Sequence, residues 1–574
     1  MAPIRVGDVD SVPTVSTTGA ATSPPERSRN DGSSLAGRSN PSSGSADLST
    51  FDRLRRRVRP LLQQLLPLAI AVLFSGPAAF VLWRTFRLGA LSESLDEIVG
   101  PLWRTVQLAV LVSASTAIIG TGLAWLTTRT DLPGQRFWRV TLLLPLVLPS
   151  FVGAAAFIAG LAPGGIIHDA LGTIGIDTPR RFRGLGAAWL VLTAFTYPYV
   201  LLPVTARFSN LPANLDESAR LLGLSSTATF LRVTLPQLRS AILGGSLLVF
   251  LYTVSDFGAV QLLGYDTLTR VVYATRQTNR ALSFAAASVV LVLALAVVAL
   301  ERSQRGATPP DRRASIRPPR PIRLGRRAAP ALLVCTVVAS IGLVVPVVSL
   351  GTWARRGLVD GRVGFGELLD PTVSTASVSV IAALVAIVVV LPVAIATTRR
   401  PSVSSQVAAV AVIGGFAIPG LVIALALAVL TLNTPALDRW YQTLPVLIGA
   451  YVIHFGSQAM ASSESAVRAV PSDLRESSRL LEPRRVRRWI HVDLPLMRPG
   501  LVAGGGLVML ATLKELPATL LLSPIGFSTL ATEIWASYEE GFYAATGLAS
   551  LVLIALSALL TWALVLRRSD VVRA

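Results

Sequence analysis

Lysine, cysteine and histidine are nearly absent from this chain of 574 residues, and each shortage excludes a kind of chemistry. Lys514 is the only lysine, and it stands between Leu513 and Glu515 rather than after a glycine-rich turn. The chain therefore lacks the phosphate-binding loop of ATP-hydrolysing domains. Cys335 is the only cysteine, which excludes disulfides within the chain and cysteine-based metal sites. The three histidines show no ligand spacing, so we expect no metal site and no catalytic residue.

Charged residues are also scarce, at 15% of the chain, whereas 52% of the residues are apolar. A chain of this length and composition does not fit one soluble domain. A membrane-spanning helix needs about 20 mainly apolar residues. Twelve stretches qualify: residues 61–83, 105–128, 140–161, 185–206, 240–263, 281–300, 331–353, 373–397, 405–430, 443–466, 499–522 and 543–566.

The net charge of +20 is unevenly distributed. If the N-terminus is cytoplasmic, the loops on the cytoplasmic side hold the arginine clusters at 53–59, 302–327, 475–498 and 567–573. This is the positive-inside bias, so the sequence predicts a multi-pass protein of a bacterial-type cell membrane with both termini in the cytoplasm. The lipid bilayer is then a partner of the chain. Nucleic acid is not expected as one, because no soluble basic domain is present.

The sequence repeats itself once. Residues 211–223 (LPANLDESARLLG) match residues 470–482 (VPSDLRESSRLLE) at an offset of 259, and Pro149 aligns with Pro419 at an offset of 270. A longer loop after the third stretch accounts for the change in offset. Each half therefore has six spans in the same order, which makes the repeats parallel.

The repeat defines the expected domains. They are a disordered cytoplasmic tail (1–50), a first repeat of six spans (51–301, with a cytoplasmic loop at 208–239), an Arg/Pro-rich cytoplasmic linker (302–328), a second repeat of six spans (329–566, with a loop at 467–498) and a cytoplasmic C-terminus (567–574).

The first of these loops carries a spaced motif. It contains Glu217-Ser218-Ala219, then Gly223, then Leu235-Pro236. Gly223 favours the left-handed conformation that ends a helix, so the motif predicts a helix, a turn and a second helix. The spacing resembles the EAA motif of ABC importer permeases, and the resemblance implies that this element docks on a separate ATP-hydrolysing subunit.

The second loop repeats the motif with one departure. Glu476-Ser477-Ser478 and Leu494-Pro495 keep the spacing, but Glu482 followed by Pro483 stands where glycine is expected. Proline disfavours the helical conformation of the residue before it. We therefore expect a helix break at 482–483 that is caused by Pro483 rather than by a glycine. The two loops are then unlike in shape, and unequal coupling by the two halves follows as an expectation.

The segments 254–273 and 513–535 resemble those of the ferric-iron importer permeases with fused halves. The resemblance implies the all-α fold of type I ABC importer permeases, with 12 transmembrane helices in two parallel six-helix repeats. It also implies two ATP-binding cassette subunits, which use ATP and Mg, and an extracytoplasmic solute-binding protein. No cofactor is expected in this chain. Thiamine, polyamines, phosphonate or an inorganic anion remain alternative solutes, because related halves transport them.

Three of the ionisable residues inside predicted spans are candidates for the wall of a translocation path. Asp256 and Glu515 correspond at the offset of 259, and Lys514 precedes Glu515. Ionisable groups in a membrane are unfavourable and usually face a cavity or a partner. The alternatives are that Lys514 pairs with Glu515, or that the two acids anchor helix ends.

Two other functions remain open at this point. A secondary transporter driven by an ion gradient shares the number of spans, but it has no need of two cytoplasmic helical motifs. A membrane scaffold that uses these motifs as docking sites is the other alternative, since architecture alone does not establish function.

Overall fold

The computed structural model describes residues 45–175, 181–211, 218–219, 221–304, 321–482 and 484–563. These ranges form helices and connecting turns, with one isolated parallel bridge, between Thr130 and Ile322. The first half comprises α1 (Ser45–Arg87), α2 (Ala90–Arg129), α3 (Gln135–Thr141), η1 (Leu144–Val147), α4 (Ser150–Leu161), α5 (Ile166–Thr173), α6 (Leu185–Thr196), α7 (Pro198–Ser209), α9 (Ser226–Thr229), η2 (Phe230–Thr234), α10 (Leu235–Ser255), α11 (Gly258–Leu262), α12 (Leu268–Thr275) and α13 (Arg280–Gln304).

The second half comprises η3 (Gly325–Arg327), α14 (Ala328–Ala339), η4 (Ser340–Val344), α15 (Val345–Val359), η5 (Phe365–Leu368), α16 (Leu369–Arg399), α17 (Val403–Gly415), α18 (Gly420–Asn433), η6 (Asp438–Trp440), α19 (Leu444–Arg468), α20 (Ser472–Leu481), α21 (Arg485–Arg488), η7 (Trp489–Asp493), α22 (Leu494–Leu513), α23 (Pro517–Leu522), α24 (Leu530–Glu539) and α25 (Tyr543–Thr561). Of the predicted tail, linker and C-terminus, residues 1–44, 305–320 and 564–574 lie outside the described residues.

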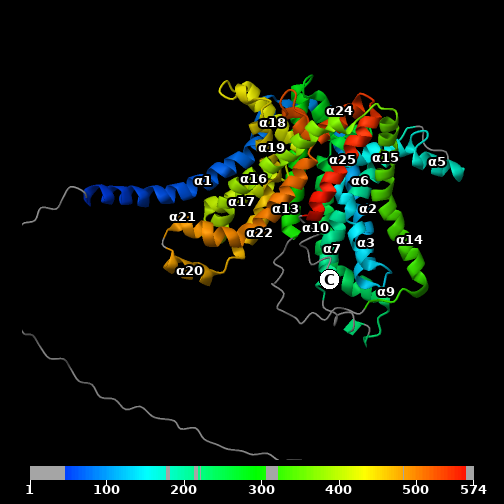
Figure 1. Ribbon diagram of the computed structural model, residues 1–574, viewed down its shortest axis with the longest axis horizontal. Coiled ribbons are helices and arrows are strands. Elements are labelled where there is room, and N and C mark those ends of the chain that lie inside the picture. The colour runs from blue at the N-terminus through cyan, green and yellow to red at the C-terminus, as the bar shows by residue number, and fades with distance from the viewer. Residues whose placement is uncertain are drawn as a thin grey trace, which may run out of the picture. The chain divides into compact units, whose positions relative to one another are not determined.

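The predicted all-α polytopic fold is confirmed. In the described ranges ten helices are long and apolar enough to cross a membrane, and the number is twelve if each of two bent helix pairs is one span. All twelve predicted stretches lie in the compact unit that begins at Leu61. Figure 1 shows α2, α7 and α10 packed together in one part of this unit and α16, α19 and α22 in another.

Two of the predicted spans, residues 140–161 and 405–430, are bent helix pairs in the structure. The helices on either side of Pro149 meet at 98°, and those on either side of Pro419 meet at 109°. Proline has no backbone N–H and moves the residue before it away from helix, which explains why both bends fall at the same place in the repeat. Each proline then caps the helix that follows it, α4 or α18.

The helices of the predicted fifth and eleventh spans, Phe230–Ser255 and Arg485–Leu513, begin and end earlier than expected. α10 ends at Ser255 and α22 ends at Leu513, and each is followed by a short helix, α11 or α23. The stretches 240–263 and 499–522 are therefore each broken in two.

The parallel repeat extends to single hydrogen bonds. In the first half the backbone N–H of Leu268 donates to the hydroxyl of Thr105 at 2.9 Å, and in the second half that of Leu530 donates to the hydroxyl of Thr375 at 2.8 Å. Both bonds join the start of α12 or α24 to the helix that contains the second span of the same half. The two halves are thus built by the same local rules.

The first span of each half packs on the opposite half. Phe74 of α1 is fully buried, and a Cβ atom at Gly456 of α19 would lie 2.6 Å from its ring. Gly342 of η4 lies against the first half in the same way, since a Cβ atom there would be 2.8 Å from Pro145. The halves are interlocked rather than laid side by side.

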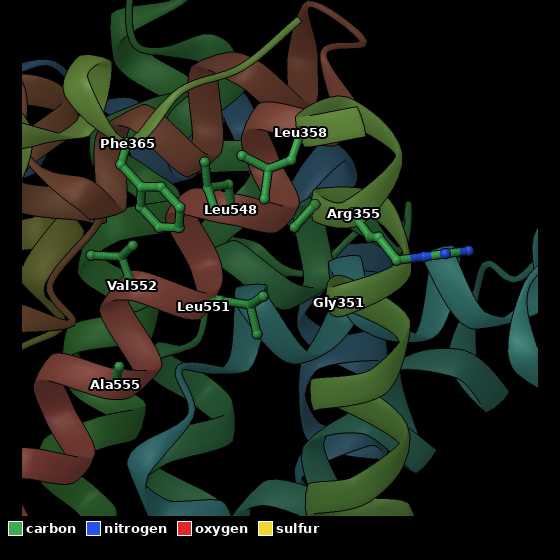
Figure 2. A pocket seen from close by; sticks show the side chains of 9 residues that line it. Gly351, Arg355, Leu358, Phe365, Leu548, Leu551, Val552 and Ala555 are labelled. Atoms are coloured by element: carbon green, nitrogen blue, oxygen red, sulfur yellow. The ribbon is translucent and has the colours of Figure 1, made fainter. Parts of the chain in front are cut away.

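A groove of about 360 Å³ lies between α15 and α25 (Figure 2). Its lining is almost entirely apolar and includes Leu358, Phe365, Leu551 and Val552, with Arg355 beside it. None of the predicted path residues lines it. An apolar groove between two spans is a surface for lipid tails, so we do not assign it to the path.

The packing at the second bend is tight enough to test. A Cβ atom at Gly415 would lie 2.4 Å from the backbone oxygen of Ile453, so Gly415→Ala should destabilise the protein by about 1–3 kcal/mol through overpacking. Gly414→Ala is the matched control, because nothing lies within 4 Å of a Cβ atom there. Thermal unfolding of the purified protein in detergent measures both. Equal unfolding temperatures would contradict the described packing.

Candidate functional site

The first EAA loop is described only in part, because Glu217 lies outside the described residues. Ser218 is exposed and Ala219 is buried. Gly223 has a φ of 82°, and the N–H of Leu224 donates to the carbonyl of Ala219 at 3.1 Å. This is the pattern of a helix that ends at a left-handed glycine, which confirms the predicted turn at Gly223.

The second EAA loop contains a complete helix, α20. Glu476 and Ser477 are exposed on it, whereas Ser478 is buried. The helix ends at Leu481, and Glu482 is extended, with φ −132° and ψ 98°. Pro483 lies outside the described residues, and the next helix begins at Arg485. The helix therefore ends where the sequence predicts a break, without a glycine.

Both loops expose a pair of leucines that the sequence argument missed. Leu221 and Leu222 are 88% and 83% exposed, and Leu480 and Leu481, at the offset of 259, are 88% and 86% exposed. Exposed apolar residues that recur at the same place in two copies mark a surface made for a partner. The shared sequence Arg-Leu-Leu at the end of both motif helices was the available signal.

Each loop returns to the membrane through a π-helical turn. η2 precedes Leu235-Pro236 and η7 precedes Leu494-Pro495, again at the offset of 259. A proline ring in a regular α-helix clashes with the carbonyl four residues earlier. The wider π turn gives that ring room, so the Leu-Pro end of the motif lies within one continuous helix in each half.

The predicted path residues lie at the breaks in the spans. Asp256 follows α10, and its Oδ1 accepts hydrogen bonds from the N–H groups of Ala259 at 3.1 Å and Val260 at 3.3 Å. Its Oδ2 accepts a hydrogen bond from the hydroxyl of Ser150, the first residue of α4. The carboxylate therefore joins the bend of the third span to the break of the fifth.

Glu515 has the corresponding place in the second half. Its Oε1 accepts a hydrogen bond from the N–H of Ala518 at 3.1 Å, at the start of α23. Gly420 stands where the first half has Ser150, and a Cβ atom there would lie only 2.5 Å from that oxygen. The longer glutamate thus occupies the space that the serine fills in the first half. Ser150 with Asp256 and Gly420 with Glu515 are compensated pairs.

Lys514 connects the two halves. Its Nζ donates a hydrogen bond to the backbone oxygen of Leu146 at 2.9 Å. In a 3-10 turn the carbonyl of Leu146 would accept the N–H of the residue three positions later, but that residue is Pro149, which has no N–H. The ammonium group of Lys514 supplies the missing donor. Within the described residues no ion pair joins Lys514 to Glu515. The alternative that these two residues pair with each other therefore does not agree with the geometry. The corresponding residue of the first half is Ser255, which is too short for such a contact.

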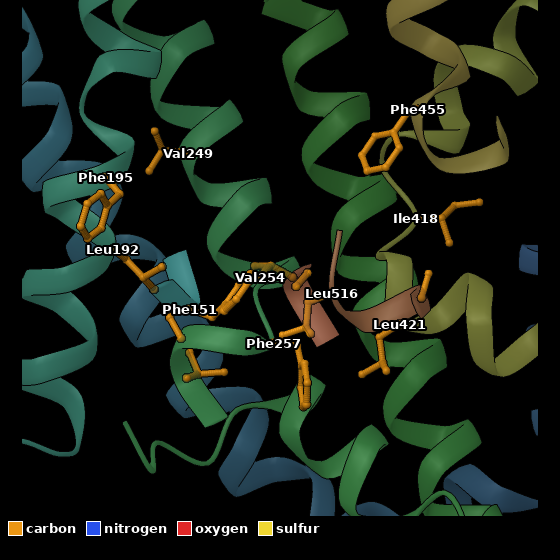
Figure 3. Close-up of a cluster of buried hydrophobic side chains, with 14 of the residues drawn as sticks. Phe151, Leu192, Phe195, Val249, Val254, Phe257, Ile418, Leu421, Phe455 and Leu516 are labelled. Atoms are coloured by element: carbon orange, nitrogen blue, oxygen red, sulfur yellow. The ribbon is translucent and has the colours of Figure 1, made fainter. Parts of the chain in front are cut away.

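Buried apolar side chains from both halves form one cluster, in which Phe257 of the first half and Leu516 of the second lie close together (Figure 3). The rings of Phe257 and Trp535 lie 5.4 Å apart across the boundary between the halves. A Cβ atom at Gly258 would lie 2.7 Å from Phe151 and 3.4 Å from Leu516. The boundary is therefore closed by side-chain packing at this level.

The described residues contain no group of three His, Cys, Asp or Glu side chains that could hold a metal ion. His454 lies close to Gly420, with its Nε2 3.6 Å from the position of a Cβ atom there. Its ring stacks on Phe416, and its Nδ1 is buried without a hydrogen-bond partner among the described residues.

The compensated pairs can be tested by exchanging them. Gly420→Ser alone should lower the unfolding temperature, because the new side chain overlaps Glu515, and displacing a hydrogen-bonded carboxylate has a destabilising effect of about 1–3 kcal/mol. Adding Glu515→Asp recreates the pairing of the first half and should restore most of the loss. Thermal unfolding in detergent is the measurement. Additive losses in the double variant would refute the compensation.

The chain matches known proteins along most of its length. The sequence profile of the family described as "Binding-protein-dependent transport system inner membrane component" matches residues 116–305 and 389–569, which is more than half of the chain in two copies. The Fe(3+)-transport system permease protein FbpB 2 of Haemophilus influenzae is 27% identical over 517 residues, covering 87% of this chain and 96% of that protein.

Shorter relatives match one half at a time. The molybdenum transport system permease protein ModB of Escherichia coli is 28% identical over 211 residues, 35% of this chain and 91% of that protein. The sulfate transport system permease protein CysW of Escherichia coli is 26% identical over 247 residues, 41% of this chain and 83% of that protein. Two motif loops, two six-span repeats and a profile that matches twice agree, and the chain belongs to the family of binding-protein-dependent ABC importer permeases, as a fused two-half member.

Proposed function

We propose that this chain forms the translocation path of an ATP-driven importer for ferric iron. The observation that carries the proposal is that the similarity to a protein named as an Fe(3+) permease covers 87% of this chain, whereas the matches to the molybdenum and sulfate permeases cover 35% and 41% of it. An inorganic anion is the second candidate, because those two relatives are named for anions or their metal.

The charges inside the bundle support iron over an oxyanion. Anions bind well at helix N-termini, where backbone N–H groups are free. Here the carboxylates of Asp256 and Glu515 already accept the N–H groups at the starts of α11 and α23. With Lys514 as the one cation, the three residues have a formal charge of −1, which repels a permeating anion. On this proposal they line the path and hold its backbone in place.

The coupling proposal rests on the two motif loops. Two separate ATP-binding cassette subunits, which use ATP and Mg, dock on the cytoplasmic side against the loops that contain Glu217, Gly223, Glu476 and Glu482, and a solute-binding protein docks on the opposite face. The exposed leucine pairs support this, since apolar side chains of that exposure gain free energy by burial in a partner. The arginine clusters support cytoplasmic termini in a bacterial-type membrane.

Uptake of labelled ferric iron tests the solute. The chain is reconstituted in liposomes with its ATPase and solute-binding protein, and ATP-dependent accumulation of iron is compared with that of molybdate and sulfate. We expect iron alone to accumulate. Accumulation of either anion without iron would refute the iron proposal and leave the importer class in place.

Asp256→Asn and Glu515→Gln test the path residues in the same liposomes. Each substitution replaces a charge-assisted acceptor by a neutral amide, so we expect uptake to fall about tenfold at normal membrane levels. Ser255→Ala, at the position that corresponds to Lys514, is the control and should leave uptake unchanged. Normal uptake in both acid variants would remove them from the path.

Leu480→Ser combined with Leu481→Ser tests the docking surface. Loss of two buried leucine contacts should reduce co-purification of the ATPase about tenfold or more. Ile525→Ser is the matched control, because Ile525 is 93% exposed but lies at the opposite end of the bundle, beside α24. Equal recovery of the ATPase with all three proteins would show that the leucines are not its contact.

A further inference from the structure

A cluster of three charged residues lies where α20 meets the spans. Asp493, in η7, has a side chain only 6% exposed, and its Oδ1 accepts a hydrogen bond from Arg399 at 2.8 Å. The same oxygen lies 3.8 Å from Nε of Arg475, which is on α20. One carboxylate thus joins the end of α16, the start of α22 and the motif helix.

Few other polar contacts hold α20 to the rest of the chain. Glu476 and Ser477 are exposed, and the hydroxyl of Ser478 bonds to the backbone of its own helix at Arg475. Arg475 also donates to the carbonyl of Val470, just before α20, at 3.4 Å. At the other end of α20, Oε2 of Glu482 lies 3.6 Å from Nε of Arg487, and Arg488 donates to the carbonyl of Glu482 at 3.2 Å, so that end also contacts α21. Among the residues described, the contact with Asp493 is therefore the side-chain ion pair that links α20 to α16, through Arg399.

The spans that Asp493 joins are packed as one block. Beneath the charged cluster, α16, α19 and α22 share an apolar cluster that includes Leu391, Val467 and Met497. Met497 and Val467 are almost completely buried. A dense interior transmits displacement rather than absorbing it.

α22 then extends from this cluster to the boundary between the halves. It has 20 residues, which corresponds to about 30 Å of helix, and it is followed directly by Lys514. Lys514 is bonded to Leu146 of the first half. One continuous helix, with Pro499 inside it, thus connects the charged cluster at one end with the contact between the halves at the other.

The first half has the same arginine at this position but different residues at the other two. Arg129 corresponds to Arg399 and is 5% exposed. Thr234 stands in place of Asp493, and Asp216, outside the described residues, stands in place of Arg475. The second half thus has an acid on the π turn where the first half has a threonine, while the arginine at the end of the second span is common to both.

We propose that Asp493 is a positioning residue which transmits movement of α20, through Arg399 and Arg475, to the block of α16 and α22. The inference rests on the proposed function, because the movement would come from the ATPase subunits. Removing the carboxylate would leave two arginines facing each other, so α20 would move without carrying the spans with it. Docking of the ATPase, which uses the exposed face of α20, would remain.

The test separates docking from transmission. Spin labels are placed at Ile174, which follows α5 in the first half, and at Ile525, which precedes α24 in the second; the two side chains are 67% and 93% exposed. The native Cys335 is buried and does not compete for label. Distances are measured by pulsed electron paramagnetic resonance on the complex with the ATPase, with and without Mg-ATP, beside its rate of ATP hydrolysis. The unaltered complex should show a change in distance on addition of nucleotide.

We expect Asp493→Thr to keep ATPase recovery and hydrolysis within about twofold but to abolish most of the distance change. Adding Arg475→Asp places an acid on α20 as in the first half, and should restore the change. If Asp493→Thr fails to accumulate, Arg475→Gln removes the α20 contact while leaving the Arg399–Asp493 bond intact, and the same loss is expected.

The outcomes distinguish this inference from the proposed function. No nucleotide-dependent change in the unaltered complex would count against ATP-driven alternation itself. A normal change in both Asp493→Thr and Arg475→Gln, with the unaltered complex responding, would overturn the role of Asp493 alone. Loss of ATPase recovery in these variants would also overturn it, because the cluster would then serve docking and not transmission.

Discussion

Backbone hydrogen bonding inside the bilayer is the constraint on which the rest of this structure depends. Apolar surroundings offer no water to an N–H or carbonyl group, so a broken span needs protein partners at each break. Four breaks occur here, two in each half, and the side chains of Asp256, Glu515 and Lys514 supply donors and acceptors at three of them. Polar residues in these spans therefore stabilise the backbone at the breaks, whether or not they contact a solute.

The same constraint explains how the halves differ without losing their shared design. A serine with an aspartate and a glycine with a glutamate bring a carboxylate oxygen to the same place beside a bent helix. The motif helices likewise end in two different ways, at the left-handed Gly223 in the first half and at the extended Glu482 in the second. What the repeat preserves is the position of a group in space rather than the identity of a residue.

The sequence predicted the repeat, the all-α fold, the glycine turn at Gly223 and the end of α20, because each depends on local pattern and hydropathy. It did not predict the bends at Pro149 and Pro419, since proline within a span is compatible with a straight helix when neighbours satisfy the backbone. The hydrogen bond between Lys514 and Leu146 could not be predicted from the sequence either. Its partner is a backbone oxygen 368 residues away, and no side-chain pattern marks it.

That bond has a consequence for fused permeases. In a two-fold assembly of identical half-length chains, every contact between subunits occurs twice, so a lysine at this position would bring two positive charges into apolar surroundings. A single chain containing both halves is free of that symmetry. It can keep one cation that bonds to one carbonyl of the other half. Each half can therefore evolve residues that contact only the other half of the same chain.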